Sequence, residues 1–216
     1  MRAQMLLYAE DLKKIYDEEP TRSAELRESL MDTIKILVNA IESRDPRQIG
    51  HGSRVARYCQ IPAQQLGWSE ERAVQAAIGG LIRDVSLVSL DEDVARKRGP
   101  MDRAEIAQFR QHPNLGARLL RGTKSLEPLV PYVLHHHEHF DGTGYPERFR
   151  GQDIPIEARL VAVVDEFDDR RSTLPAGDPN ATDEVLRELR QLTADRLDPA
   201  IVQAFLEADR AGHIIV

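Results

Sequence analysis

Apolar residues recur at intervals of three and four along most of this sequence, and no segment alternates apolar and polar residues like a strand. Aromatic residues make up only 5% of the 216 residues, so the core must consist mainly of Leu, Ile, Val and Ala side chains. Such a core favours packed helices over a sheet sandwich. The predicted fold class is therefore all-α, with helices expected at about residues 51–66, 70–84, 102–111, 113–121, 127–139, 156–171, 181–192 and 199–208.

The first 36 residues predict amphipathic helices, with a break at Pro20. One apolar stripe consists of Met5, Tyr8, Leu12 and Ile15, and the next of Leu26, Leu30, Ile34, Leu37 and Ile41. Either stripe can dock on the core of the following domain or form the seam of a homodimer, and there are too few heptads to decide. We expect residues 1–36 to form an N-terminal extension with a role in dimerisation, and residues 37–216 to form the main domain.

The balance of charge and the cysteine content exclude several classes of protein. There are 29 basic and 36 acidic side chains, a formal net charge of -7, so we expect no extended nucleic-acid binding. Cys59 is the single cysteine, which excludes an internal disulfide and a cysteine-based zinc cage. The apolar run at residues 160–164 is far too short for a bilayer, and the N-terminus lacks the apolar stretch of a signal peptide. We therefore expect a cytoplasmic protein with no membrane association.

A histidine cluster is the main candidate for chemistry. Positions 135–137 are all histidine, Glu138 follows, and a glycine-rich turn begins at Gly142. Adjacent side chains on a helix point about 100° apart, so two neighbours share a site only with the help of a helix end or kink. The pattern predicts that His136 and His137 bind a metal. The alternative is that both histidines make ordinary hydrogen bonds within the fold.

The sequence resembles the HD-GYP family of metal-dependent cyclic di-GMP phosphodiesterases over about residues 37–206. The family's landmarks occur here in the same order: GHGSRVA at residues 50–56, KRGPM at 97–101, HPNLG at 112–116, HHEHFDGTGYP at 136–146, ARLVAVVDEFD at 158–168 and LDP at 197–199. The resemblance implies an all-α, HD-type helical bundle with metals bound between helices.

The same resemblance implies two metal sites that share one carboxylate. The first would use His51, Asp84, Asp165 and the histidine of the family's His-Asp pair, and the second would use Asp84, His112, His136 and His137. Some members bind a third metal through a glutamate, and because Arg47 occupies that position here we expect no third metal. Three nitrogens and one carboxylate suit Zn, Fe, Mn, Co or Ni. We expect one divalent transition metal at the second site, or none.

The His-Asp pair departs from the family's pattern of His-Asp-x-Gly-Lys. Arg83 stands in place of the histidine, Ser86 in place of the glycine and Leu87 in place of the lysine that would contact a substrate phosphate. A guanidinium has no lone pair for a metal and carries a permanent charge. We therefore expect the first site to hold no ion, and Arg83 to bond Asp84 and Asp165 in the ion's place.

Two further segments bear on the ligand. The family's ligand-gripping Arg-Pro-Tyr-Arg/Lys segment is replaced by Leu-Pro-Ala-Gly at residues 174–177, so binding of cyclic di-GMP is left open. Arg170 and Arg171 lie nearby, either as a substitute or as solvated surface charges. The loop that gives the family part of its name is complete, and the family links it to substrate access and to contact with partner proteins; it contains Asp141, Gly142, Gly144, Tyr145 and Pro146.

We therefore expect a non-catalytic regulatory or binding module in cyclic di-GMP signalling, dimeric and able to contact a signalling protein through this loop. One alternative is a weakly active metal-dependent cyclic di-GMP phosphodiesterase. Another is a metal hydrolase that acts on a different nucleotide or phosphoester.

Overall fold

The computed structural model describes residues 25, 28–29, 31–45, 48–95, 97, 99–175, 178, 180–193 and 195–211. The first expected apolar stripe, Leu26 and Leu30 of the second, and Arg47 lie outside these residues. The chain divides into two compact units, residues 1–37 and residues 38–216. The described residues 31–37 of the first unit are helical, as are residues 38–42 at the start of the second.

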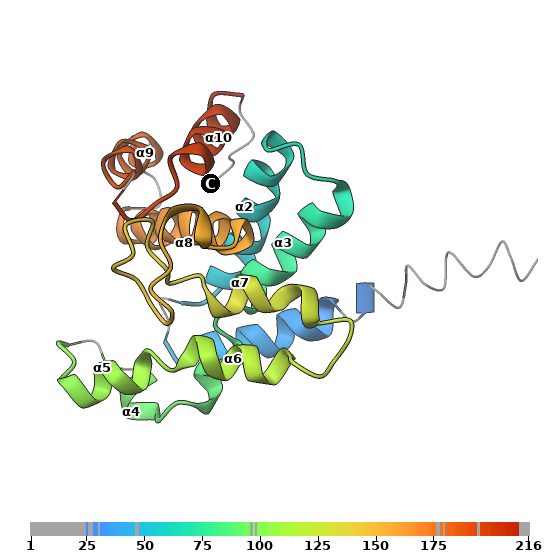
Figure 1. Cartoon of the computed structure of the whole chain (residues 1–216), viewed down its shortest axis with the longest axis vertical. Coiled ribbons are helices and arrows are strands. Elements are labelled where there is room, and N and C mark those ends of the chain that lie inside the picture. The colour runs from blue at the N-terminus through green and yellow to red at the C-terminus, as the bar shows by residue number, and fades with distance from the viewer. Residues whose placement is uncertain are drawn as a thin grey trace, which may run out of the picture. The chain divides into compact units, whose positions relative to one another are not determined.

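The second unit is a bundle of helices (Figure 1). Its described residues contain no strand, only an isolated bridge between Thr193 and Leu197, so the predicted all-α class is confirmed. The α-helices are α2 (His51–Gln65), α3 (Glu70–Ile82), α4 (Glu92–Ala95), α5 (Arg103–Phe109), α6 (His112–Leu120), α7 (Val130–Leu134), α8 (Ile156–Thr173), α9 (Ala181–Gln191) and α10 (Pro199–Arg210). Short 3₁₀ turns are η1 (Val85–Ser89), η2 (Glu127–Leu129) and η3 (Gly151–Asp153).

Several helices begin where side chains satisfy the first free backbone N–H groups. Ser69 caps α3 by accepting from Arg72 N, and Asp198 caps α10 by accepting from Ala200 N. Asp102 and Glu105 form a reciprocal capping box at the start of α5. These local signals explain why the expected starts of these helices agree with the observed starts to within a residue.

The core lies where α2, α3, α8 and α10 pack together. Tyr58, Phe167 and Phe205 are buried there in successive edge-to-face contacts, with ring centroids 5.3 and 4.9 Å apart. Glycine allows α3 to approach its neighbours closely. A Cβ at Gly80 would lie 2.8 Å from the Cys59 sulfur of α2, and one at Gly79 would lie 2.6 Å from the Cβ of Tyr132 in α7. These close contacts fix the position of the C-terminal end of α3.

The helix expected at residues 127–139 is the main error in the predicted elements. The segment is a 3₁₀ turn followed by α7, which ends at Leu134, so the histidine cluster lies beyond the helix. The reason is tertiary: the carboxylate of Glu138 turns toward the following loop and accepts hydrogen bonds from Glu147 N at 2.7 Å and Arg148 N at 3.1 Å. η1 and α4 were also not expected.

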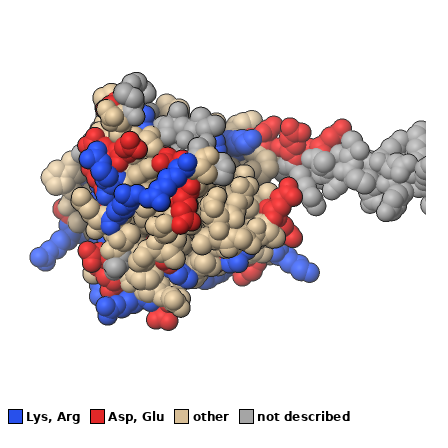
Figure 2. All heavy atoms as spheres, turned by 90° about the horizontal axis from the view of Figure 1, so that it is seen from above, with Lys and Arg blue, Asp and Glu red and all other residues tan. Residues whose placement is uncertain are grey.

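Acidic and basic side chains are interspersed on the face shown in Figure 2, so that face has no broad region of one sign. Within the described part of the chain, no helix combines the length and the apolar character that crossing a bilayer requires.

Candidate metal centre

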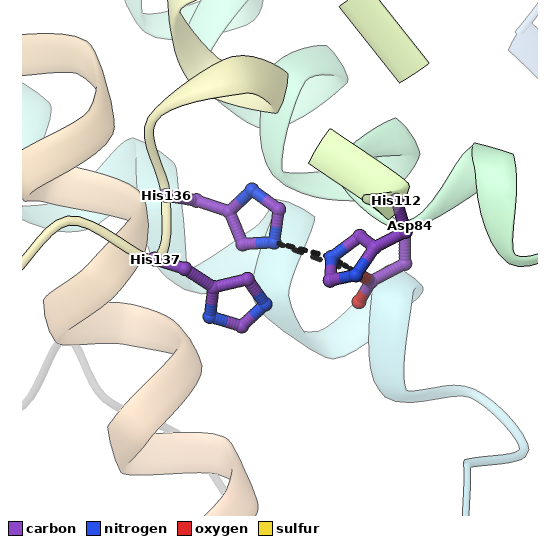
Figure 3. A group of neighbouring side chains, drawn as sticks. All are labelled: Asp84, His112, His136 and His137. Atoms are coloured by element: carbon purple, nitrogen blue, oxygen red, sulfur yellow. Dashed lines mark hydrogen bonds and ion pairs between the residues drawn. The ribbon is translucent and has the colours of Figure 1, made fainter. Parts of the chain in front are cut away.

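Three separate parts of the fold bring Asp84, His112, His136 and His137 together (Figure 3). Asp84 follows α3, His112 is the first residue of α6, and the two adjacent histidines follow α7. One ligand-type atom from each residue lies within 4.8 Å of those from the other three. The end of α7 matters here, because the chain is free of helical geometry at the point where both neighbouring imidazoles enter one site.

The backbone determines which nitrogen of two imidazoles faces the cluster. His112 Nδ1 lies 2.8 Å from the Phe109 carbonyl oxygen, and His136 Nδ1 lies 2.8 Å from that of Val133. A carbonyl oxygen only accepts, so each Nδ1 carries the proton and donates it. In the neutral rings, both Nε2 atoms therefore present lone pairs toward Asp84. Such a hydrogen bond from the far nitrogen is typical of metal-binding histidines.

The spacing of these atoms fits one transition metal. The two Nε2 atoms are 3.4 Å apart, and they lie 3.3 Å (His112) and 3.6 Å (His136) from Asp84 Oδ1. A tetrahedral ion with bonds of about 2.0 Å holds its ligand atoms roughly 3.3 Å apart. Without a cation or an added proton, three acceptors would face one another at these distances. Asp84, His112 and His136 therefore have the donor chemistry and the spacing for a single ion, and His137 offers a further nitrogen within 4.8 Å of the other three ligand atoms.

His137 completes the cluster as a neutral ring. Burial, helped by the imidazoles of His136 and His112, holds the pKa of His137 well below its usual value. Its ring stacks on that of Tyr145, with centroids 4.7 Å apart and planes 22° from parallel. A neutral imidazole keeps a lone pair available near pH 7.

A buried guanidinium lies directly beside this cluster. Arg83 is 1% exposed, and its Nη2 lies 2.7 Å from Asp165 Oδ1, lies 3.2 Å from Asp84 Oδ2 and contacts His51 Nε2. Its Nη1 donates to the Gly80 carbonyl oxygen at 2.9 Å. The sequence predicted that Arg83 bonds both carboxylates, and the structure has both contacts. Burial lowers the pKa of Arg83, but Asp165 and Asp84 raise it above its usual value, so the charge is permanent.

The electrostatics of the two carboxylates follow from this cation. Burial raises the pKa of Asp84 and of Asp165, but the Arg83 guanidinium acts together with neighbouring histidines (His112 and His136 at Asp84, His51 at Asp165) and holds both values well below the usual range. Both carboxylates are therefore ionised at neutral pH. Asp84 belongs to both neighbourhoods, because Oδ2 faces Arg83 and Oδ1 faces the histidines.

His51 is held by residues that the sequence did not single out. Its Nδ1 lies 2.6 Å from Asp168 Oδ2, and Arg54 donates to both oxygens of the same carboxylate. Burial and Arg83 lower the pKa of His51, while Asp165 and Asp168 raise it to about 9. The spacing could have indicated this pairing, because Arg54 lies three residues after His51 on α2 and Asp168 three residues after Asp165 on α8.

Ser86 and Leu87, the two positions at which the sequence predicted a departure from the family's pattern, make local packing contacts. The Ser86 hydroxyl donates to the His112 carbonyl oxygen at 2.5 Å and so ties η1 to the start of α6. Leu87 helps to line a cavity of about 60 Å³ that also touches Arg83, Asp84 and His51.

The loop at residues 141–146 is anchored to the histidine segment. Asp141 Oδ1 accepts from Thr143 N at 2.8 Å, and Tyr145 N donates to the His137 carbonyl oxygen at 3.1 Å. Gly142 has a φ of 85°, and a Cβ at Gly144 would lie 2.5 Å from the His137 carbonyl oxygen. Both glycines are therefore required by geometry. Pro146 follows Tyr145 through a cis peptide bond.

In the segment after Asp165, Arg170 does not have a free charge with which to bind a ligand. Arg170 is paired with Glu166 at 2.7 Å and with Glu188 at 2.5 Å, so its charge is already used within the fold. Residues 176 and 177 of the divergent segment lie outside the described residues.

Comparisons with known proteins place this geometry in a family. A family model described as "HD domain" matches residues 35–201. The chain is 31% identical over 185 residues to 3'3'-cGAMP-specific phosphodiesterase 2 of Vibrio cholerae, covering 85% of this chain and 35% of that protein. It is 32% identical over 184 residues to the cyclic di-GMP phosphodiesterase response regulator RpfG of Xanthomonas campestris, covering 84% of this chain and 49% of the relative. The chain thus spans at most about half the length of these two relatives.

Solved structures agree on the fold. A cyclic GMP-AMP-specific phosphodiesterase of Vibrio cholerae superposes with a TM-score of 0.64 at 18% identity, covering 82% of this chain and 48% of that chain. Bd1817, an HDG"Y"P protein of Bdellovibrio bacteriovorus, superposes with a TM-score of 0.58 at 20% identity, covering 74% and 51%. Together with the family match and the loop at residues 141–146, these likenesses confirm the resemblance noted from the sequence. The chain belongs to the HD domain family, in its HD-GYP branch.

Proposed function

We propose that this chain is a degenerate HD-GYP domain that acts as a non-catalytic regulatory or binding module in cyclic di-GMP signalling and holds at most one divalent transition metal. One observation carries the proposal: Arg83 Nη2 lies among His51, Asp84 and Asp165, the three groups that would otherwise surround the first ion. The curated relatives are named as phosphodiesterases of cyclic di-GMP or cGAMP, which supports the signalling context.

The Arg83 guanidinium and a divalent ion at the first site would compete for the same space. A divalent ion about 4 Å from the guanidinium would be repelled by about 8 kcal/mol at an effective dielectric of 20. A water that replaced one histidine ligand would not offset that cost. In two-metal hydrolysis, two ions activate the nucleophile and stabilise the phosphate oxygens together, and a single site lacks this clamp. Leu87 also withholds a cation from the substrate phosphate.

The four-residue cluster favours a second candidate, a weakly active metal-dependent phosphodiesterase. One ion bound by Asp84 and the three histidines would lower the pKa of a bound water and so supply a nucleophile near neutral pH. The protein's own contribution would be to hold the imidazoles through the Phe109 and Val133 carbonyl groups. Zn, Fe, Mn, Co and Ni all suit this donor set.

The proposal includes partners. Residues 1–36 would form a homodimer, and the loop at residues 141–146 would contact a signalling protein in the cytoplasm. The intact glycines and the ordered hydrogen bonds of this loop support a retained surface. Cyclic di-GMP itself remains a candidate ligand without an identified grip.

Counting metals tests the proposal directly. Protein purified without chelator and without a nickel column should contain no more than one ion per chain by elemental analysis. The Arg83→His/Leu87→Lys double variant should take up a second ion, because it restores the lone pair and removes the competing charge. Lys97→His adds a histidine at a surface ion pair and should leave the count unchanged.

Activity separates the two candidates. Wild-type protein supplied with Mn²⁺ or Fe²⁺ should not hydrolyse cyclic di-GMP or 3'3'-cGAMP at rates typical of enzymes, which begin at about one turnover per second. Two ions in the wild type would contradict the proposal. Turnover at that rate would favour the enzyme instead.

A further inference from the structure

A groove that Tyr145 helps to line has a composition unlike that of the chain as a whole. It has a volume of about 450 Å³ and lies between α5, the start of α6 and the loop at residues 141–146. Three arginines line it, Arg103, Arg110 and Arg148, and no acidic residue does. The whole chain has an acidic excess of seven charges, so an acid-free cavity with three guanidiniums is a local departure from the background.

The two helical arginines share one face of α5. Arg103, Ile106, Ala107 and Arg110 have the spacing of one helical stripe, and all four line the groove. Arg103 is the first residue of α5, where the helix dipole disfavours a cation. Helix stability therefore gives no reason for an arginine there. Ile106, Ala107 and Pro146 supply apolar lining between the charges.

These guanidiniums have no carboxylate partners among the described residues. Among the described residues, the arginines that form ion pairs are others, such as Arg54, Arg159 and Arg170. Arg110 lies over the Tyr145 ring, with its guanidinium carbon 5.1 Å from the centroid, which orients it without neutralising it. The groove thus presents unneutralised charge to whatever enters it.

The third arginine is held at a conformational cost. Arg148 is the non-glycine residue with a positive φ, 58°, among the described residues. Its N–H is bound by the buried Glu138 carboxylate at 3.1 Å, which over-determines this backbone conformation. Left-handed backbone is unfavourable for a residue with a side chain, and such strain gathers at functional sites. Glu138 thereby fixes an arginine at the rim of the groove.

We infer that this groove binds a phosphate group of a small-molecule ligand. Its volume is in the range of small-ligand sites, about 300–1,000 Å³. Arginine forks match phosphate oxygens in pairs of hydrogen bonds, and Gln111 and Asn114 add amide groups on the same wall. The Tyr145 ring, which stacks on His137, joins the groove to the metal-type cluster. The inference names a class of ligand for the proposed binding module, and in that respect it rests on the proposed function.

Calorimetric titration of the full chain tests the inference with pyrophosphate, guanosine 5'-monophosphate, cyclic di-GMP and guanosine. Pyrophosphate and at least one of the nucleotides should bind, guanosine should not, and binding should weaken as NaCl is raised. Arg103→Gln/Arg110→Gln should reduce affinity at least about tenfold, because each lost charge-assisted hydrogen bond contributes more than a neutral one. The preferred phosphate compound identifies the source of the phosphate.

Matched variants keep the result interpretable. Arg118→Gln/Arg121→Gln removes the same charge from exposed arginines in and just after α6, outside the groove, and should change affinity less than about twofold. Arg148→Asn removes the third guanidinium with a residue that tolerates the left-handed region. It should weaken binding while the circular dichroism spectrum stays unchanged, which provides a second route if the first double variant does not fold.

Several outcomes would overturn the inference. They are no binding of any phosphate compound, equal losses in the groove and control variants, or tight binding of a tetraglutamate peptide with none of phosphate. Metal content should be the same in the groove variants and the wild type. A rapid hydrolysis of cyclic di-GMP that survives in these variants would sink the proposed regulatory function and leave the groove to be judged by the titrations alone.

Discussion

Arg83 places a cationic side chain where almost no solvent reaches it, and two of its neighbours, Asp84 and Asp165, have the opposite charge. Asp84 and Asp165 balance it, while Gly80 and His51 contact the rest of the fork. The sequence and its resemblance to the family together predicted both carboxylate contacts, because a guanidinium cannot coordinate an ion but can pair with the acidic ligands of that ion.

Replacing Arg83 with Met should therefore destabilise the domain strongly. The side chain keeps a similar length but leaves two half-buried carboxylates without the buried cation that they share, and breaking a fully buried pair costs about 3–5 kcal/mol, which is the upper limit here. The free energy of unfolding, measured by urea titration, checks this. Lys97→Met, which breaks the more exposed pair with Glu105, should cost about 1 kcal/mol or less. Equal losses of unfolding free energy in the two variants would mean that the Arg83 ion pairs stabilise the fold no more than the Lys97–Glu105 pair does.

Other residues of the site could not be found from the sequence with the same argument. Asp168 and Arg54 support His51, and their spacing of three residues from Asp165 and His51 is a weak signal in the sequence, because a carboxylate and an arginine on helical faces most often point to solvent. Glu138 was noted only as part of the histidine run, although its buried carboxylate organises the following loop. Each role depends on which element lies opposite the side chain, and that information is tertiary.

At the level of elements, helix starts were more predictable than helix ends. Caps such as Ser69 and Asp102 act within one turn, so the sequence near a start largely determines it. The end of α7 has no such signal, because the run after Leu134 contains no glycine or proline before Gly142. Instead, the backbone N–H groups of residues 147 and 148 bind the Glu138 carboxylate, and these contacts hold the chain after Leu134 out of a continued helix.

The approach of α3 to α7 gives a prediction at this scale. Gly79→Ala should lower the free energy of unfolding by about 1–3 kcal/mol, because the new methyl group would meet the buried Tyr132 ring. This loss should exceed the gain of about 1 kcal/mol that alanine brings to a helix interior. Gly99→Ala, where no atom lies within 4 Å of the new Cβ, should change stability by less than about 0.5 kcal/mol. Thermal and urea unfolding of both variants measure these changes, and equal stabilities would mean that residue 79 has room for a methyl group beside Tyr132.

The whole molecule divides into two compact units after Leu37, and the boundary expected after residue 36 stays a prediction. The fold class, the family and the order of the helices in the second unit followed from periodicity and motif order. Whether the first unit dimerises stays a prediction, because most of its apolar stripe lies outside the described residues.

A single bound ion should stabilise the second unit as a whole, because its four ligands come from segments far apart in sequence. At a free ion concentration about 100 times the dissociation constant, the gain is about 2.7 kcal/mol. For a domain of this size, that corresponds to a rise of about 5–10 °C in Tm. Scanning calorimetry with Mn²⁺, Co²⁺ or Zn²⁺ should show the rise for at least one of these ions.

His136→Ala should abolish this rise, whereas His139→Ala should retain it, because His139 bonds Thr143 outside the cluster. A rise that persists in the His136 variant would assign the ion to another part of the chain.

Because the guanidinium lies between Asp84 and Asp165, the junction of α3 with α8 does not depend on a metal ion from solution. An ion held only by coordination exchanges with the free metal around the protein, and an iron ion also changes its valence with oxygen. A charge tethered by a covalent side chain does neither. The junction of α3 with α8 should therefore keep its geometry under iron starvation and oxidative stress, leaving only the histidine cluster to respond to either.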